Sequence, residues 1–221
     1  KYDYRCSVMA GAEAVVFLRD LRDVNDQPQL IQGCLSGTLG YICSQLEDHP
    51  FSEILAEAHQ KGYTEPHPRD DLNGLDVARK LLILARTAGY NVSLSDVKVK
   101  PFIPEEFLGE DDVTAFLNSA RQLDEHFANL TTAAAKSGNV LRYVAKMDAG
   151  EGVLTVSLQD VSRNSQLGTL QGTLNKLMVV SRTYPMSAPY SIEAPGAGLE
   201  VTAQNIRRGL LALLPERQFK E

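Results

Sequence analysis

The sequence predicts an α+β fold in which a mixed or mostly antiparallel sheet packs against helices. Strand-like and helix-like segments alternate along the chain, and most of the expected strands come late, with helices on both sides of them. The turn DAGEG at 148–152 separates two long strand-like segments, which favours an antiparallel hairpin. With 221 residues, 43% of them apolar, the chain can bury a substantial core.

The first half of the chain is expected to contain two strands and four helices. Apolar residues three and four positions apart indicate its helices, and Leu39, Ile42 and Leu46 form one such stripe. Ser52 is expected to cap the start of the next helix and Gly62 its end. The expected strands are residues 2–7 and 30–35, and the expected helices are 12–21, 38–46, 53–62 and 75–87.

The second half is expected to hold most of the sheet. A strand is expected at 97–103, between prolines. Apolar residues such as Phe116, Leu123 and Leu130 share one side of a run that predicts a single long helix over 111–137, closed by Gly138. The other strands are expected at 140–147, 153–161, 176–184 and 191–194, and a last helix follows APGAGLEVTA and ends at residue 214.

Charge and composition exclude several classes of protein. The net charge is −6 and no basic cluster is present, so nucleic acid is not an expected partner. No segment reaches the roughly 18 apolar residues that cross a bilayer, and the N-terminus lacks the pattern of a signal peptide. A cytoplasmic protein without a membrane partner is therefore expected. Since Lys1 opens a strand-like segment, the chain is expected to be a fragment or domain of a longer protein.

The cysteines predict neither disulfides nor a metal site. Cys6, Cys34 and Cys43 are odd in number and have no metal-ligand spacing, so they are expected to pack as reduced, small apolar residues. His67 has no second histidine or cysteine nearby, which argues against zinc. It could act as a general base, although a lone loop histidine is usually unremarkable.

The segment LDVARKLLILA places a charged pair on an apolar helix. Asp76 and Lys80 are four residues apart and therefore share one face. Apolar residues are expected to leave this helix little room for a solvent face, and a buried ion pair is costly unless each member finds partners. A polar cleft lined also by Glu65, Asp70 and Asp71 would resolve the conflict, and a structural ion-pair network is the alternative.

Two glycine-containing segments precede helices and could bind an anion. Ser36, Gly37 and Thr38 could offer backbone N–H groups and hydroxyls, and they also suit a helix cap. The segment GAG at 196–198 has the same two interpretations. Neither is a dinucleotide fingerprint, because no G-x-G-x-x-G follows a strand in this chain.

Four segments, in matching order and spacing, resemble the homoserine dehydrogenase family. They are GCLSGTLGYI, GYTEPHPRDDLNGLDVARKLLILAR, NVLRYVAKMD and APGAGLEVTA. The second segment, continued to Val92, most resembles the dehydrogenase part of bifunctional aspartate kinase–homoserine dehydrogenases. The resemblance implies that residues 1–221 form one catalytic and dimerisation domain of this type, lacking the family's N-terminal nucleotide-binding domain. It also implies a homodimer, and a plastid location if the source is a plant.

The resemblance implies an oxidoreductase that interconverts L-aspartate 4-semialdehyde and L-homoserine with NAD or NADP, in threonine, methionine and isoleucine biosynthesis. Lys80 matches the catalytic lysine, and Asp76 matches an aspartate that holds the substrate and orients proton transfer. Glu65 and Asp71 match residues that bind the substrate's amine, as expected for carboxylates facing a cation. Further substrate positions are Tyr63, Gly37 and Thr38, and the residues matching a segment near the nicotinamide are Gly196, Ala197 and Gly198.

Several residues depart from the family pattern. Arg5 stands where many members have a glutamate that helps to bind a monovalent cation, so such a cation is not expected here. Met9 replaces a glycine near the nicotinamide, and His67 and Ala194 also differ from the common residues. Arg5, Met9 and the absent nucleotide-binding domain motivate an alternative function, a non-catalytic amino-acid-binding or dimerisation module derived from the enzyme.

Overall fold

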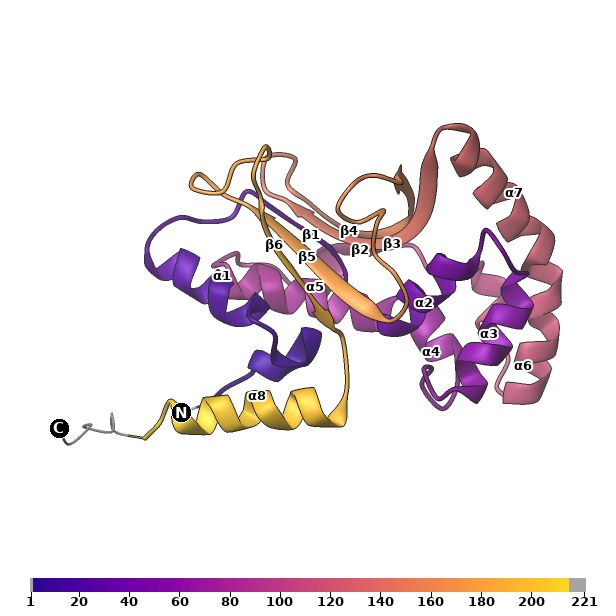
Figure 1. Ribbon diagram of the computed structural model, residues 1–221, viewed down its shortest axis with the longest axis horizontal. Helices are drawn as coiled ribbons and strands as arrows, with labels where there is room; N and C mark the ends of the chain where they lie inside the picture. The colour runs from indigo at the N-terminus through magenta and orange to yellow at the C-terminus, as the bar shows by residue number, and fades with distance from the viewer. Residues whose placement is uncertain (1, 215–221) are drawn as a thin grey trace.

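A six-stranded sheet forms the centre of the molecule, with helices packed along one face (Figure 1). The computed structural model describes residues 2–214. The helices are α1 (Ala14–Asp23), α2 (Gly37–Gln45), α3 (Phe51–Gln60), α4 (Arg69–Leu72), α5 (Leu75–Thr87), α6 (Val113–Ser119), α7 (Asp124–Lys136) and α8 (Leu199–Leu211). The strands are β1 (Leu30–Cys34), β2 (Val97–Val99), β3 (Asn139–Asp148), β4 (Val153–Ser162), β5 (Leu174–Val180) and β6 (Tyr190–Pro195).

The sheet confirms the α+β class and the mixed, mostly antiparallel topology. The strand order is β2-β4-β3-β1-β5-β6, and only the β2–β4 pair is parallel. The expected hairpin is present, because β3 and β4 pair along their whole length from Asn139↔Ser162 to Asp148↔Val153. The expected strand at 97–103 is shorter than predicted, because the N–H of Phe102 donates to the carbonyl of Leu72 at 2.8 Å instead of continuing the pairing with β4.

The core lies between the sheet and the helices. Along β3, Leu141, Tyr143, Ala145 and Met147 alternate on one face and pack in the main apolar cluster with residues of α2, α5 and α7. Full burial of a large apolar side chain contributes about 1.5–3 kcal/mol, so this face fixes α5 against the sheet.

Helix α5 has the predicted bounds, but its surroundings differ from the expectation. Val77, Leu81 and Leu84 are fully buried. Its other side, however, faces solvent, since Arg79 is exposed and Leu75 is 40% exposed. The expectation that apolar residues leave little room for a solvent face is therefore wrong, because several apolar residues occupy the half-buried flanks.

The expected strand at 2–7 is also wrong. Residues Arg5–Ser7 form a 3-10 turn instead. The carboxylate of Asp3 accepts a hydrogen bond from the backbone N–H of Arg5, and the Ser7 hydroxyl donates to the carbonyl of Tyr4. These local hydrogen bonds compete with pairing in a sheet.

The expected long helix over 111–137 is interrupted. A 3-10 turn at Ala120–Leu123 separates α6 from α7 and brings both Ala120 and Leu123 into the core. Asp124 then reaches the start of α3, where its two carboxylate oxygens accept from the N–H and the hydroxyl of Ser52, at 2.7 and 2.8 Å. Ser52 lies inside the first turn of α3 and is not its N-cap, which is Pro50, so that prediction is wrong. Gly62 follows the end of α3 with a φ of 70°, as expected of a glycine that closes a helix.

The strand expected at 176–184 ends earlier, with β5 at Val180. Residues 181–184 form a turn held by the buried Asp26, which accepts from the Ser181 hydroxyl at 2.8 Å.

Cys34 and Cys43 are buried free thiols, as predicted, and burial raises the pKa of each to about 12. No helix among residues 2–214 combines the length and the apolar character needed to span a bilayer.

The opposite face of the sheet is partly covered by the loop at 163–173, which Arg142 holds in place. Arg142 is 4% exposed, and its guanidinium donates to the carbonyls of Leu167, Gly168 and Leu170 in this loop, at 2.7 to 3.1 Å. The end of the same loop reaches the start of α2, since a Cβ on Gly37 would lie 3.2 Å from the carbonyl oxygen of Thr173. Arg142 therefore supports the start of α2 through this loop.

Candidate functional site

The first turns of α5 present the predicted lysine and aspartate. The ammonium of Lys80 lies 2.8 Å from Asp76 Oδ2 and donates to the carbonyl of Leu35 at 3.0 Å. The Asp76 side chain is 57% exposed, whereas the Lys80 side chain is 19% exposed. The aspartate is therefore open to a ligand, and the lysine is fixed by the chain between β1 and α2.

A second group of predicted residues surrounds Asp71, which α4 carries. The Asp71 Oδ2 atom accepts from the backbone N–H of Glu65 at 2.8 Å. Its Oδ1 atom lies 2.8 Å from the hydroxyl of Thr38, which also lies 2.6 Å from the carbonyl of Tyr63. The structure thus brings together residues from α2, the loop after α3, and α4.

The environment of Asp71 favours its protonated form. Burial raises the pKa of Asp71, and the negative charges of Glu65 and Asp76 raise it further, although hydrogen bonds from Glu65 and Thr38 oppose them. The Thr38 hydroxyl has one proton for two acceptor oxygens, so a proton on Asp71 would complete the network. A cationic amine from a ligand would relieve the same concentration of negative charge.

We expect Asp71→Asn to raise the free energy of unfolding at pH 7. The folded-state pKa of Asp71 lies above its ordinary value of 3.8, so the folded state binds the proton more tightly. Its stabilising contribution is complete below the unfolded pKa and is lost as pH rises through the folded pKa. An asparagine keeps both contacts without the charge.

Urea unfolding of Asp71→Asn at several pH values would measure this effect. The wild-type protein should lose stability as pH rises through the folded pKa of Asp71, and the variant should lose less. Asp70→Asn is the matched control, because Asp70 is an exposed neighbour. A variant less stable than the wild type at pH 7 would contradict the account of Asp71.

A cavity of about 690 Å³ lies beside this cluster, and Lys80 lines it. The segment from Gly196 to Gly198 forms another part of its wall. The N-terminal segment and α8 complete the lining, namely Cys6, Ser7, Met9 and Ala10 from the first and Leu199, Thr202, Ala203 and Ile206 from the second. Because Lys80 also pairs with Asp76, it links the carboxylates to the cavity.

Sequence reasoning missed the residue beneath the glycine segment. Asn175 of β5 is fully buried, and neither polar atom of its side chain has a hydrogen-bond partner among the described residues. A Cβ on Gly196 would lie 2.4 Å from this amide, so only glycine permits the close approach. The sequence signal for this residue was an asparagine within the otherwise mostly apolar strand LNKLMVV, because a buried amide usually needs a partner.

The remaining predicted residues occupy the margin of the site. The Tyr63 side chain packs edge-on against Tyr41, with ring centroids 5.1 Å apart. His67 packs against Phe116, with ring centroids 5.1 Å apart, and accepts from the N–H of Arg69. Asp70 is exposed and makes no hydrogen bond or ion pair with Glu65, Asp71, Asp76 or Lys80, so its place in the cleft stays a prediction. Among residues 2–214, no three His, Cys, Asp or Glu side chains are grouped as metal ligands.

The fold and the site define an α+β domain with an acidic cluster, a lysine and an adjoining cavity. A sequence profile of homoserine dehydrogenase matches residues 15–211. The chain is 38% identical over 213 residues to bifunctional aspartokinase/homoserine dehydrogenase 2 of Zea mays, and 40% identical over 215 residues to the bifunctional aspartokinase/homoserine dehydrogenase of Haemophilus influenzae. The chain belongs to the homoserine dehydrogenase family.

The compared proteins are longer than this chain. The matches cover 96% and 97% of the chain but only 23% of the maize protein and 26% of the Haemophilus protein. A crystal structure of a Candida auris protein of unknown function has a TM-score of 0.89 and 33% identity, covering 94% of this chain and 59% of that one. The chain thus spans about a quarter of each bifunctional relative's length.

Proposed function

We propose that this chain forms the substrate-binding and proton-transfer part of a homoserine dehydrogenase. The reaction interconverts L-aspartate 4-semialdehyde and L-homoserine with NAD or NADP, in the biosynthesis of threonine, methionine and isoleucine. The observation that carries the proposal is the position of Lys80, which contacts Asp76 and also lines the cavity beside Gly196 and Gly198.

The acidic cluster suits the charge of an amino-acid substrate. A substrate ammonium group needs nearby carboxylates, and the negative charges of Glu65 and Asp76 both act on Asp71. Asp76 is exposed, so it is placed to bind the incoming amine. Asp71 is anchored by Thr38, so it is placed to orient the amine. We assign Tyr63 and Gly37 to the rim of the same pocket.

Lys80 is proposed to move a proton at the substrate's oxygen. When bound, NAD(P)H supplies the hydride that reduces the aldehyde carbon. The oxygen of the aldehyde then gains negative charge, and the Lys80 ammonium donates a proton to it. In the reverse direction, the neutral amine of Lys80 accepts the proton from the hydroxyl of homoserine. Asp76 holds the lysine in position for both directions.

The cavity residues fit the nicotinamide end of such a cofactor. Gly196 leaves no room for a side chain beside Asn175, so the backbone itself forms this part of the wall. Ala197, Gly198 and the side chain of Met9 contribute small or apolar surface next to Lys80. The volume of the cavity, about 690 Å³, lies within the range of small-molecule sites, which is about 300–1,000 Å³.

Assay of the gene's complete product would test this function. We expect oxidation of NADPH or NADH that depends on L-aspartate 4-semialdehyde and saturates with it. Comparing the two nucleotides would settle the preference between NAD and NADP. If neither nucleotide is oxidised although homoserine binds, the alternative of a non-catalytic amino-acid-binding module would replace this proposal.

We further propose a homodimer, which the open edge of the sheet at β6 could serve. Sedimentation analysis would measure the association. We also propose a cytoplasmic location, or a plastid one for a plant protein, since the named relatives include bacterial and chloroplastic proteins.

A further inference from the structure

The N-terminal segment makes a strained turn at the wall of the cavity. Met9, Ala10 and Gly11 have successive φ values of 51°, 49° and 90°. Glycine adopts such values readily, whereas methionine and alanine do so at a cost in free energy. Met9 and Ala10 are buried and line the cavity with Lys80. Such strain persists only where the surrounding structure imposes it.

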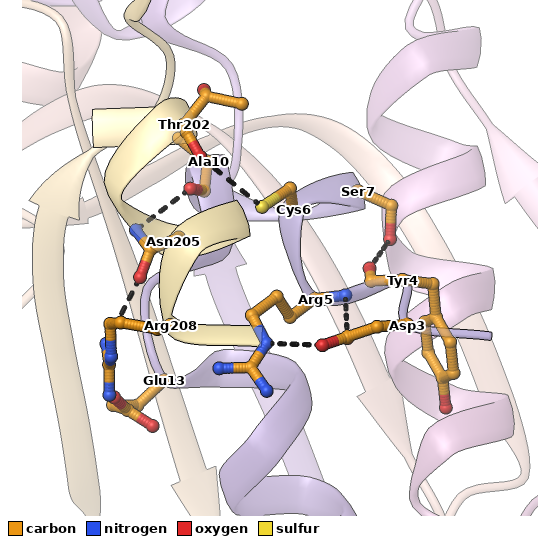
Figure 2. Close-up of polar contacts among 10 residues, drawn as sticks. All are labelled: Asp3, Tyr4, Arg5, Cys6, Ser7, Ala10, Glu13, Thr202, Asn205 and Arg208. Carbon is orange, nitrogen blue, oxygen red and sulfur yellow. Dashed lines mark hydrogen bonds and ion pairs between the residues drawn. The ribbon is translucent and has the colours of Figure 1, made fainter. Parts of the chain in front are cut away.

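Helix α8 makes the contacts that hold this turn (Figure 2). Asn205 is 5% exposed, and its Nδ2 donates to the carbonyl of Ala10 at 3.1 Å. Its Oδ1 accepts from Arg208 at 3.1 Å, and Arg208 also pairs with Glu13 at the start of α1. A Cβ on Gly11 would lie 2.6 Å from Asn205 Cβ, so the helix and the turn are in direct contact.

The position of α8 makes this contact relevant to the site. The helix begins directly after Gly198, and Figure 1 shows it lying across the N-terminal segment, away from the sheet. The glycine segment and the strained turn line the same cavity. By holding Ala10, Asn205 therefore fixes one part of the cavity wall relative to another.

The charge of the segment before the turn does not fit the monovalent cation that many members of the family bind with a glutamate at this position. Arg5 is itself cationic, and its Nε lies 2.8 Å from Asp3 Oδ2 while its N–H donates to Asp3 Oδ1 at 3.0 Å. The Arg5 side chain is 14% exposed. The carbonyl of Ala10, which could otherwise face a cation, already accepts the Asn205 amide. The guanidinium of Arg5 is itself a cation, and it would repel a metal ion bound close to it.

The charge state of Asp3 supports the pairing with Arg5. Partial burial raises the pKa of Asp3, but the backbone and side-chain hydrogen bonds from Arg5 outweigh it and leave the pKa below its ordinary value. The carboxylate is therefore ionised at neutral pH. The pair lies against α8, since a Cβ on Gly209 would approach Asp3 Oδ2 to 2.7 Å.

We propose that a side-chain clamp holds the turn Met9–Gly11 in place of a bound monovalent cation: Asn205 of α8 bonds to the turn, and the Asp3–Arg5 pair packs against α8 at Gly209. Arg5 supplies the positive charge, and Asn205 supplies the donor to the Ala10 carbonyl. Asn205 is then a positioning residue for the cavity wall. The inference rests on family membership and on this geometry, not on the proposed activity, so its test needs no substrate.

Melting of the 221-residue chain in different chloride salts tests the ion part of the proposal. We expect the same Tm in equal concentrations of sodium, potassium and tetramethylammonium chloride. Arg5→Glu should lower the Tm in tetramethylammonium chloride and recover at least about 3 °C of it in sodium or potassium chloride. Arg19→Glu, a charge reversal near Asp3, should show no recovery specific to these ions. A wild-type Tm raised by sodium or potassium, or an Arg5→Glu variant without recovery, would overturn the proposal.

Hydrogen exchange tests the role of Asn205 in the native fold. The N–H groups of Gly11 and Ala12 donate to the carbonyls of Val8 and Met9 within the turn. In Asn205→Ala we expect these two amides to exchange at least about tenfold faster, while the amides of β3 keep their rates. Asn139→Ala, which removes an exposed amide, is the matched control and should change neither. Unchanged exchange of Gly11 and Ala12 would overturn the clamp.

Discussion

Replacing Lys80 by alanine is expected to lower the turnover of homoserine oxidation by about 10²- to 10⁴-fold, the usual effect of removing a positioned proton-transfer group. The Lys80 ammonium contacts only Asp76 and the Leu35 carbonyl as polar partners among the described residues. Because the lysine lies at the cavity rather than in the core, the variant should fold. Turnover measured with saturating homoserine and nucleotide, on the gene's complete product, gives the result.

Arg79→Ala is the matched control for Lys80→Ala. Arg79 precedes Lys80 on α5 but is exposed, so its replacement should leave turnover near that of the wild type. Normal turnover in Lys80→Ala would show that another group moves the proton.

Arg142→Met is expected to lower the free energy of unfolding by about 3–5 kcal/mol. The guanidinium donates to the buried carbonyls of Leu167, Gly168 and Leu170. Methionine would leave the Gly168 and Leu170 carbonyls without this donor, whereas the Leu167 carbonyl still accepts from the N–H of Leu170. Each buried polar group that loses its partner costs about 1–3 kcal/mol. The removal of a buried charge offsets part of this loss. Urea unfolding of the 221-residue chain measures the difference.

Arg163→Met is the control for this loss. Arg163 belongs to the same loop but pairs with Glu47 at the surface, where an ion pair contributes about 0–1 kcal/mol. Equal losses in the two variants would argue against the role given to Arg142. We expect Arg142→Met to lose more stability than Arg163→Met. It should also bind homoserine more weakly, because the loop contacts Gly37 at the start of α2.

Local patterns in the sequence predicted those parts of the fold that depend on neighbouring residues. The bounds of α5 and the contact between Asp76 and Lys80 follow from helical spacing, and the β3–β4 hairpin follows from its turn. The segment at 2–7 was predicted wrongly, because the side chains of Asp3 and Ser7 outweigh its strand-like composition.

Distant contacts were beyond the same reasoning. Spacing could not place Gly196 beside Lys80, although the family resemblance assigned both to one site. The break before α7 depends on Asp124 reaching Ser52, which is 72 residues away in the chain. The resemblance identified Arg5 and Met9 as departures, but only the structure relates Met9–Gly11 to Asn205.

The central claim is that the acidic cluster recognises the amine of a small amino acid. Calorimetry of the chain with L-homoserine and with 4-hydroxybutanoate, which lacks the amine, tests it most directly. Charge-assisted hydrogen bonds contribute about 1.5–3 kcal/mol, so homoserine should bind at least about tenfold more tightly. Saturable heat with homoserine at millimolar concentration and a weaker signal with 4-hydroxybutanoate would support the claim; no heat with homoserine, or equal affinity for the two compounds, would contradict it.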